Sequence, residues 1–219
     1  MKQKHLIFSL ICILISIISG VLSKDLLIGG TILATGLLSA YFASEGKRIN
    51  YILGLINYLL MGYVSFKNNL YGLFFFYIFI FSPLQINGYI EWNKNLNNDN
   101  DVNVREFTLK NSIIITLSCI IGSFILGYLL SQIPEQRLAF MDASANCINL
   151  CGVILMILRF KEAWWIWLAN NIIDLFIWII TCTEQGKGAI MMLLVAIGYL
   201  LINIYGIIKW NIEAKKGNN

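Results

Sequence analysis

Charged residues are scarce in this chain. Only 13% of its 219 residues are Asp, Glu, Lys or Arg, whereas 58% are hydrophobic. A soluble domain is about 25% charged and about 45–50% apolar. So large an apolar excess cannot be hidden inside a globule of this length, whose surface must be mostly polar. The shortage of charge argues against a water-soluble domain and predicts an integral membrane protein, with the lipid bilayer as its outer solvent.

Histidine is almost missing, and paired cysteines are missing altogether. The one histidine, His5, lies near the N-terminus, which excludes Ser-His and Cys-His nucleophile pairs and the HExxH metalloprotease motif. No CxxC pair occurs among the five cysteines, which lie in or beside apolar runs: Cys12, Cys119, Cys147, Cys151 and Cys182. Thiols in such surroundings pack as small hydrophobes. The sequence therefore predicts no catalytic residues, no metal site, no cofactor and no enzyme activity.

Long apolar runs separated by polar punctuation predict about eight transmembrane helices. A bilayer core about 30 Å thick needs roughly 17–25 apolar residues of helix. The predicted spans are 6–22, 26–42, 51–66, 70–90, 112–130, 138–160, 164–181 and 189–208. Short connections make neighbouring helices antiparallel, except for the polar segment 91–111, which we interpret as a solvated linker.

The distribution of Lys and Arg predicts the orientation. One side of an eight-span arrangement holds twelve of them: Lys2, Lys4, Lys47, Arg48, Lys94, Arg105, Lys110, Arg159, Lys161, Lys209, Lys215 and Lys216. The opposite side holds four: Lys24, Lys67, Arg137 and Lys187. Basic loops remain in the cytoplasm. Both termini of this multi-pass protein of the cell membrane are therefore predicted to be cytoplasmic, and the net charge of +4 requires no nucleic-acid partner.

An internal repeat is indicated by matching helix ends. Gly88-x-x-x-Trp92 closes the fourth span and Gly206-x-x-x-Trp210 closes the eighth. In that register Gln85 answers Asn203, and Asn57 answers Asn171 if the last loop is longer by four residues. Triplets that begin four spans apart run in the same direction, which gives a 3+1+3 parallel-repeat, SWEET-like bundle preceded by one extra N-terminal helix.

The predicted organisation follows from this repeat. It comprises an N-terminal helix (1–25), a first three-helix bundle (26–92), a polar linker plus linker helix (93–134), a second three-helix bundle (135–210) and a cytoplasmic tail (211–219). Residues 1–25 have the alternative of being a signal peptide, because Lys2 and Lys4 precede an apolar run. A retained helix is favoured because no clear small-x-small cleavage site follows. The oligomeric state is left open, a homo-oligomer included.

The seventh span carries a polar and aromatic stripe. Trp164, Trp167, Asn171, Asp174 and Trp178 recur at spacings of three and four, which places them on one helix face. Unsatisfied polar groups facing lipid cost several kcal/mol each, so the stripe is expected to face other helices or a hydrated cavity. Indoles stack on flat rings and on cations, and amides both donate and accept hydrogen bonds. Interfacial anchoring by Trp164 and helix bridging by Asn171 are the alternatives.

Other predicted spans supply complementary groups: Asn50, Gly54 and Asn57; Gln85 and Asn87; Asp142, Asn146 and Asn149; Asn203 and Tyr205. A shared aqueous site between the repeats is the simplest common explanation. Asp174, midway along its span, and Asp142, near the start of its span, are the ionisable candidates. No Lys or Arg lies at matching depth, so passive facilitation is preferred to proton coupling.

These residues resemble a known family. Glu162-x-Trp164-x-x-Trp167-x-x-x-Asn171, then Tyr199 and Tyr205-Gly206-x-x-x-Trp210, look like the C-terminal half of PnuC-type vitamin transporters, and Gln85-x-x-Gly88-x-x-x-Trp92 is the N-terminal counterpart. The resemblance implies a SWEET-like fold and bidirectional facilitated uptake of nicotinamide riboside. It favours Trp167, Asn171 and Gln85 as solute contacts, followed by Asn57, Asn203 and Trp164, with Asp174 and Asn146 completing the candidate set.

The sequence thus predicts a facilitator for a vitamin or nucleoside-like solute, working by alternating access between two three-helix bundles. Thiamine and riboflavin, carried by related members, are alternative solutes, because some relatives have Asp in place of Asn171. A sugar-carrying SWEET relative is a further alternative. The competing classes are a membrane enzyme using Asp142 and Asp174, and a sensor that binds without flux.

Overall fold

The computed structural model describes residues 3–22, 24–67, 74–97, 101–107, 109–132, 139–185 and 190–217. Every regular element within these ranges is a helix, apart from isolated β-bridges. The chain divides into two compact units, Met1–Val102 (unit 1) and Asn103–Asn219 (unit 2). The boundary between them falls inside the segment 93–134 that the sequence predicted to be a linker.

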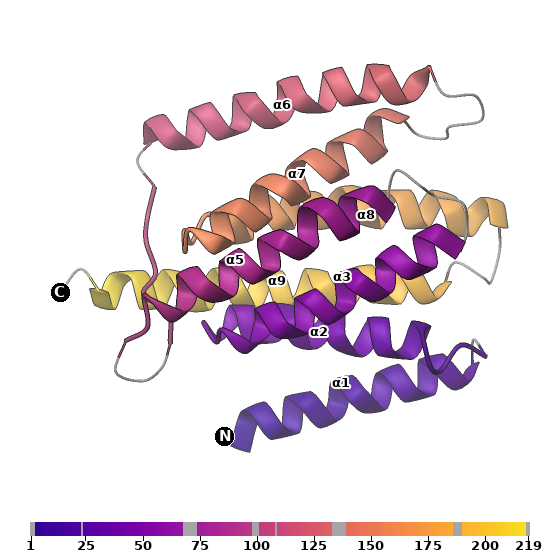
Figure 1. The fold of residues 1–219 in the computed structure, drawn as a ribbon, viewed down its shortest axis with the longest axis horizontal. Coiled ribbons are helices and arrows are strands. Elements are labelled where there is room, and N and C mark those ends of the chain that lie inside the picture. Colours follow the sequence, from indigo (N-terminus) through magenta and orange to yellow (C-terminus); the bar gives the residue numbers. More distant parts are fainter. Residues whose placement is uncertain are drawn as a thin grey trace. The chain divides into compact units, whose positions relative to one another are not determined.

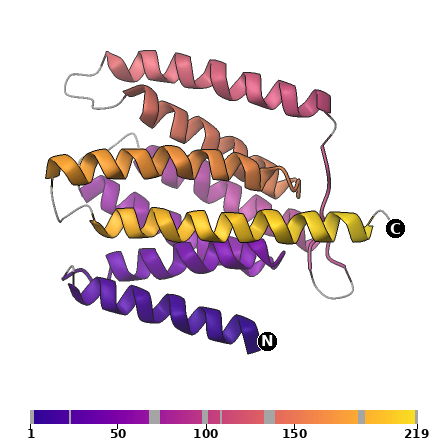
Figure 2. The ribbon, with the colours of Figure 1, turned by 180° about the vertical axis from the view of Figure 1, so that it is seen from behind.

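Unit 1 is a row of packed helices. Its elements are α1 (Gln3–Leu22), α2 (Gly29–Ser44), α3 (Ile49–Lys67), the π-helix η1 (Phe76–Phe81) and α5 (Ser82–Asn93). Helix α1 packs on α2, α2 on α3, and α3 on both η1 and α5. Figures 1 and 2 show α1 lying along α2 from opposite sides.

Unit 2 repeats this consecutive packing. It contains α6 (Leu109–Ser131), α7 (Ala139–Ile157), α8 (Ala163–Gln185) and α9 (Ile190–Gly217). Helix α6 packs on α7, α7 on α8, and α8 on α9 (Figure 1). Helix α9 continues beyond the predicted span, which ended at residue 208, and takes in most of the segment 211–219 predicted as a tail. No proline or glycine follows Gly206 until Gly217, so nothing in the sequence stops the helix earlier.

The described residues thus form eight helical segments when η1 and α5 are taken as one, as the sequence predicted. Four helices are long and apolar enough to cross a membrane by length and composition alone: Gln3–Val21, Ile49–Lys67, Ile113–Ser131 and Ala139–Ile157. Helix α2 has only 16 residues, and α5 reaches membrane length only together with η1.

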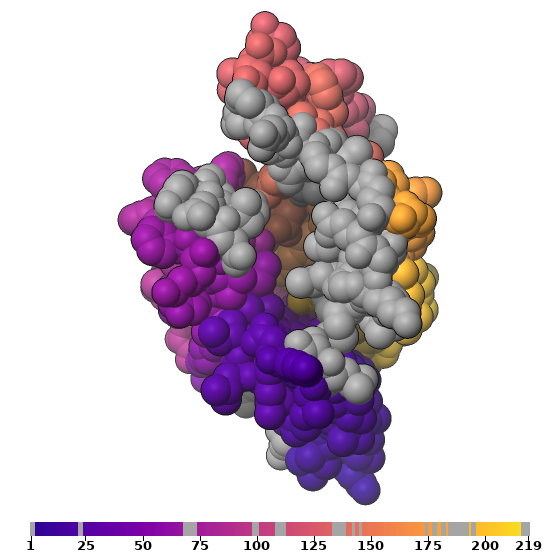
Figure 3. Space-filling view, turned by 90° about the vertical axis from the view of Figure 1, so that its right-hand side faces the viewer, coloured from indigo at the N-terminus to yellow at the C-terminus, as the bar shows by residue number. Residues whose placement is uncertain are grey.

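Large apolar side chains cover the outside of both units. On α6 the exposed set is Ile113, Ile114, Leu117, Ile120, Ile121, Phe124, Ile125, Tyr128 and Leu129. On α1 it includes Leu6, Ile7, Leu10, Ile11, Leu14 and Ile18, and Figure 3 shows this indigo helix at the surface of unit 1. Such surfaces are stable in lipid, where no water penalises the exposed apolar area.

The turns after α2 and α7 have the same backbone structure. Gly46 and Arg159 both adopt left-handed conformations, with φ of 70° and 67°. The hydrogen bonds correspond one to one: Gly46 N–H donates to Ala43 and Lys47 N–H to Phe42, as Arg159 N–H donates to Met156 and Phe160 N–H to Leu155. Both are Schellman motifs. If Gly46 is aligned with Arg159, Tyr51 aligns with Trp164 and Asn57 with Asn170. This differs by one residue from the sequence-based pairing of Asn57 with Asn171.

The fourth span begins with a π-helical turn for a chemical reason. Pro83 has no N–H, and its ring crowds the carbonyl oxygen one helical turn earlier. The chain relieves this by widening: Ser82 N–H and Ser82 Oγ both donate to the Tyr77 carbonyl oxygen, five residues back. A π-turn of this kind is a common break at functional positions of helices.

Helix α1 contacts α2 through a buried polar cluster that the sequence did not suggest. His5, expected in an N-terminal tail, is buried, and its Nδ1 lies 3.0 Å from the Tyr41 hydroxyl. Glu45, also buried, receives a hydrogen bond of 2.8 Å from Lys4 Nζ. The Tyr41 ring stacks on Phe8 with centroids 3.8 Å apart. Helix α1 is therefore fitted specifically to α2.

Candidate functional site

Two aromatic rings occupy corresponding places against glycines of the neighbouring helix. In unit 1 the Tyr51 ring lies over Gly88 and meets Trp92 edge-on, with centroids 4.9 Å apart. In unit 2 the Trp164 ring lies over Gly206 and meets Trp210 edge-on at 5.9 Å. The Gly-x-x-x-Trp motifs at the ends of α5 and α9 thus serve helix packing, because each glycine lets a ring approach the backbone.

Trp167 lies one turn further along α8 and contacts Trp164 edge-on, with centroids 5.3 Å apart. The Nε1 and Cδ1 atoms of its indole lie where a Cβ on Gly152 of α7 would stand. Trp164 has 0% exposed area, whereas Trp167 is only half-buried. The structure therefore brings the two predicted indoles together, and of the two only Trp167 keeps exposed area.

Three predicted amide side chains are buried without a protein hydrogen-bond partner. Asn171 is 9% exposed, Gln85 6% and Asn203 4%. Within the described part of the chain, none of the three side-chain amides takes part in a hydrogen bond with another residue. A fully enclosed amide is normally hydrogen-bonded. The amide atoms of these three residues are not among the fully enclosed polar atoms without a partner, so they keep some accessible area.

Asn57 differs, because its amide is used by the fold. Asn57 Nδ2 donates to the Ile32 carbonyl oxygen at 2.7 Å and to Thr35 Oγ1 at 3.2 Å. Thr35 in turn donates to the Thr31 carbonyl oxygen at 2.7 Å. This arrangement ties α3 to α2, a common role of amides between membrane helices.

The remaining predicted residues are less informative. Asn146 is half-buried on α7 and already has an interaction partner. Asp174 and Asp142 lie in α8 and α7, but their side chains fall outside the described residues. Tyr58, which the turn geometry pairs with Asn171, stacks on Phe81 with centroids 5.1 Å apart. The two units therefore present different chemistry at matching positions.

Sequence reasoning placed Gly54 on the polar face of its span without giving it a role, and it missed Gly152. Gly54 of α3 leaves room for the Gln85 side chain, whose Oε1 lies where a Gly54 Cβ would stand. Gly152 does the same for Trp167. The side chains that Gly54 and Gly152 accommodate lie on other helices. Spacing along one helix therefore cannot reveal these contacts, which appear only in the folded protein.

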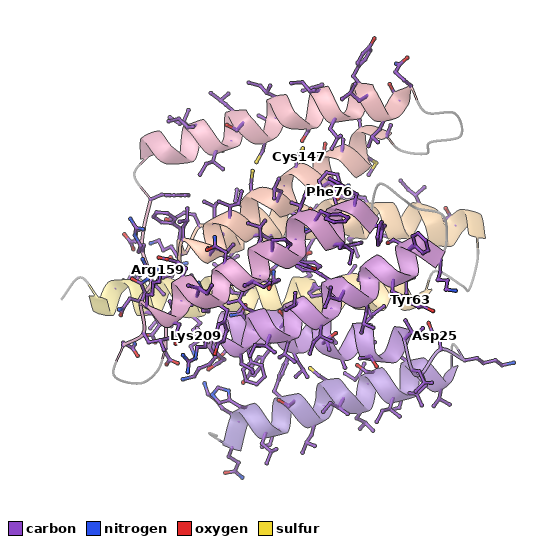
Figure 4. All side chains as sticks on the ribbon, viewed as in Figure 1. Asp25, Tyr63, Phe76, Cys147, Arg159 and Lys209 are labelled. Atoms are coloured by element: carbon purple, nitrogen blue, oxygen red, sulfur yellow. The ribbon has the colours of Figure 1, made fainter. Side chains whose placement is uncertain are left out.

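The segment after residue 100 is folded against the turns of its own unit. In unit 1, Val102 N–H donates to the Gly46 carbonyl oxygen at 3.0 Å, and Asp101 pairs with Lys47. In unit 2, Arg105 N–H donates to the Arg159 carbonyl oxygen at 2.8 Å. Figure 4 shows Arg159 at this end of unit 2. The predicted solvated linker therefore includes ordered residues.

Glu162, the first residue of the recognised C-terminal motif, also holds this segment. Its Oε2 accepts a hydrogen bond of 3.2 Å from Phe107 N–H, and the Phe107 ring lies on Phe160 with centroids 4.0 Å apart. Lys161 and Glu106 form an ion pair at 2.5 Å. Glu162 thus acts at the start of α8 as an anchor for the chain that enters unit 2.

No metal centre is apparent in the part of the chain that the structure describes, where no three His, Cys, Asp or Glu side chains are grouped to hold an ion. Cys12 and Cys119 are buried free thiols, and Cys147 and Cys151 are half-buried free thiols. Cys147 lies on the side of α7 that faces α6, with its Sγ 3.4 Å from the Cβ position of Gly122 (Figure 4).

Apolar outer faces and buried amide side chains are features of helical membrane proteins, in which polar groups are kept away from lipid. A family model described as "Nicotinamide mononucleotide transporter" matches residues 26–212. The chain belongs to this family, which comprises transporters and not enzymes.

Curated relatives bear similar names. A protein of Neisseria mucosa named "Nicotinamide riboside transporter PnuC" is 26% identical over 205 residues, which cover 90% of this chain and 76% of the relative. The protein of the same name from Haemophilus influenzae is 29% identical and covers 84% of this chain and 79% of the relative. One from Escherichia coli is 24% identical, with 80% of each chain covered.

A solved structure has the same fold. The crystal structure titled "Crystal structure of the Vitamin B3 transporter PnuC" matches with a TM-score of 0.82 and 24% identity. The match covers 99% of this chain and 94% of that one. The two chains therefore share a fold. The transporter family and the apolar helices make this chain a helical membrane protein, as its composition predicted.

Proposed function

We propose that this chain is a facilitator for nicotinamide riboside, with Trp167, Asn171 and Asn203 of unit 2 as solute contacts. Gln85 of unit 1 is a further candidate contact. The observation that carries the proposal is the burial of three amides that have no hydrogen-bond partner among the described residues. A riboside offers hydroxyl groups and a ring carboxamide, which both donate to and accept from Asn and Gln. The names of the relatives point to the same solute.

The nicotinamide ring of the riboside is flat and carries a positive charge. An indole face attracts such a ring by stacking and by a cation–π interaction of about 0.5–2 kcal/mol. Trp167 is the proposed partner of the ring because it retains accessible area. Trp164 is fully buried and contacts Trp167 edge-on. Asn57 and Asn146 are secondary candidates for solute contact, since each already has a partner.

None of the proposed contact side chains is a cation. A nucleotide would bring a phosphate dianion, whose burial requires Arg, Lys or a helix N-terminus. The riboside is therefore preferred to its 5′-phosphate, although the family model carries the mononucleotide's name. Asp174, on the same predicted face of α8, is assigned a supporting electrostatic role toward the cationic ring.

We further infer that the fold is a 3+1+3 parallel repeat with α6 as the linker helix. The matching Schellman turns at Gly46 and Arg159 and the matching ring-on-glycine contacts of Tyr51 and Trp164 support this. In such a repeat the two bundles expose the solute alternately to the two sides of the membrane. The excess of Lys and Arg on one side supports cytoplasmic termini.

Uptake into liposomes tests the function. Purified protein is reconstituted, and labelled nicotinamide riboside uptake is compared with that of empty liposomes, with and without a proton gradient. Uptake that is saturable and independent of the gradient is expected. Unlabelled nicotinamide riboside should compete, whereas its 5′-phosphate, thiamine, riboflavin and glucose should not. Liposomes that accumulate no riboside would refute the proposal, and competition by thiamine or riboflavin alone would reassign the solute.

A further inference from the structure

Trp167 is held by contacts from two directions. On one side, the edge of its indole that carries Nε1 lies against Gly152 of α7. On the other side stands Trp164, whose ring is wedged over Gly206 of α9, with Cζ3 2.6 Å from the Cβ position of that glycine. A continuous stack therefore runs from α9 through two indoles to α7, all within unit 2.

Unit 1 has no tryptophan at the position that corresponds to Trp167, and it also lacks the glycine that corresponds to Gly152. The turn geometry pairs Trp167 with Gly54 and Gly152 with Ser39. Unit 2 has Trp167 against Gly152. At the matching positions unit 1 has Gly54 against Ser39, with Ser39 Oγ 3.2 Å from where a Cβ on Gly54 would stand. The first step of the stack, Tyr51 over Gly88, is present in unit 1 all the same. A glycine at position 152 is thus needed to make room for the Trp167 indole, and not for the ring-on-glycine contact that both units share.

We infer that Gly152 and Trp164 are positioning residues that fix the orientation of the Trp167 indole for the solute. This inference rests on the proposed function. A tryptophan free to change rotamer loses entropy when it binds a ring, and that cost lowers affinity. With one indole edge against Gly152 and Trp164 packed edge-on, rotation of the Trp167 ring is blocked before the solute arrives.

The test is a double-mutant cycle between Gly152→Ala and Trp167→Ala, read as KM and maximal rate of riboside uptake. An added methyl group at Gly152 displaces the indole, so KM should rise about tenfold while the maximal rate stays within about twofold. In the Trp167→Ala background the same methyl group should change KM by less than about twofold, because the group it displaces is gone.

Gly127→Ala is the matched control. A Cβ on Gly127 of α6 would overlap the Phe140 ring of α7, which is the same steric conflict away from the proposed contacts. This variant should lose thermal stability without a change in KM. Trp164→Ala is the second variant, should Gly152→Ala fail to insert, and it should raise KM in the same way.

Circular dichroism supplies a readout that needs no solute. Edge-to-face indoles couple their transitions, so the exciton band of the Trp164–Trp167 pair should weaken in Gly152→Ala and persist in Gly127→Ala. An unchanged band, an unchanged KM in a folded Gly152→Ala protein, or an equal KM rise in both backgrounds would overturn the positioning role. If the wild-type protein transports no riboside but the two variants show the expected behaviour of the exciton band, only the proposed function is refuted.

Discussion

The Asn57 amide donates to the Ile32 carbonyl oxygen across 2.7 Å and so joins α3 to α2. This bond divides the asparagines of the predicted site into two kinds. Asn57 contributes to the fold, whereas Asn171 is buried with no protein partner for its amide in the described residues. The two residues should therefore respond differently to the same substitution.

We expect Asn57→Ala to lower stability by about 1 kcal/mol, the usual range for a hydrogen bond between membrane helices. Asn171→Ala should leave stability unchanged or slightly higher, because it removes a buried amide that the fold does not satisfy. Riboside affinity should fall about tenfold in Asn171→Ala and little in Asn57→Ala. Thermal unfolding with and without riboside measures both effects, and equal loss of stability in the two variants would contradict this division.

Trp167 should govern affinity through its ring. Base–aromatic stacking contributes about 1–3 kcal/mol, so Trp167→Ala should raise the KM for riboside uptake by roughly 5- to 150-fold. Trp167→Phe keeps a smaller ring and should recover part of this loss. Trp165, which is 55% exposed, provides the control, and Trp165→Ala should leave KM near the wild-type value. A KM for Trp167→Ala that equals the control would remove the stacking role.

The turn at Gly46 should be sensitive to backbone conformation and not to side-chain volume. A Cβ there would meet Val102 at ordinary contact distance, 3.5 Å from N and 3.6 Å from Cγ1. The left-handed φ of 70° nevertheless disfavours alanine by about 1–2 kcal/mol. Gly46→Ala should lower the unfolding temperature in detergent, and Gly46→Asn should lower it less. An alanine variant as stable as wild type would show that the turn adopts another conformation.

The contact between α1 and α2 should depend on Glu45 more than on Lys4. Lys4 is half exposed, and an ion pair with one exposed partner contributes about 0–1 kcal/mol. Glu45 is buried beside His5 and next to the turn at Gly46, so Glu45→Ala leaves a cavity and removes the partner of Lys4 and of the His5 ring. Limited proteolysis should cleave α1 faster in Glu45→Ala than in Lys4→Ala. The reverse order would contradict the assignment.

Several features were predictable from the sequence because they depend on composition and local pattern. The excess of apolar residues required a lipid-facing fold, and runs of about membrane length located the eight helical segments. Buried Gln85, Asn171 and Asn203 were recognised because a polar group in an apolar helix cannot face lipid. The contacts of the predicted polar linker to Gly46 and Arg159 were not predictable, because they join residues far apart in the sequence.

Other features depend on which residues meet across helices. The pairing of Asn57 with Asn170 follows from two turns whose residues share no sequence similarity, since a left-handed arginine performs the task of a glycine. The burial of His5 against Tyr41 follows from α1 lying on α2, which no periodicity encodes. The extension of α9 to Gly217 is different, because it follows from the local sequence, which has no breaking residue between Gly206 and Gly217.

By itself, the sequence determined that the chain is a helical membrane protein and which helices carry amide and indole side chains. Only the tertiary structure decided which of these groups the fold uses in hydrogen bonds and which have no partner among the described residues. The physical reason is that a helix face is set by spacing along one segment, whereas a hydrogen bond or a ring-on-glycine contact needs a partner from another helix. Trp167 and Gly152 acquire their relation only when α8 packs on α7.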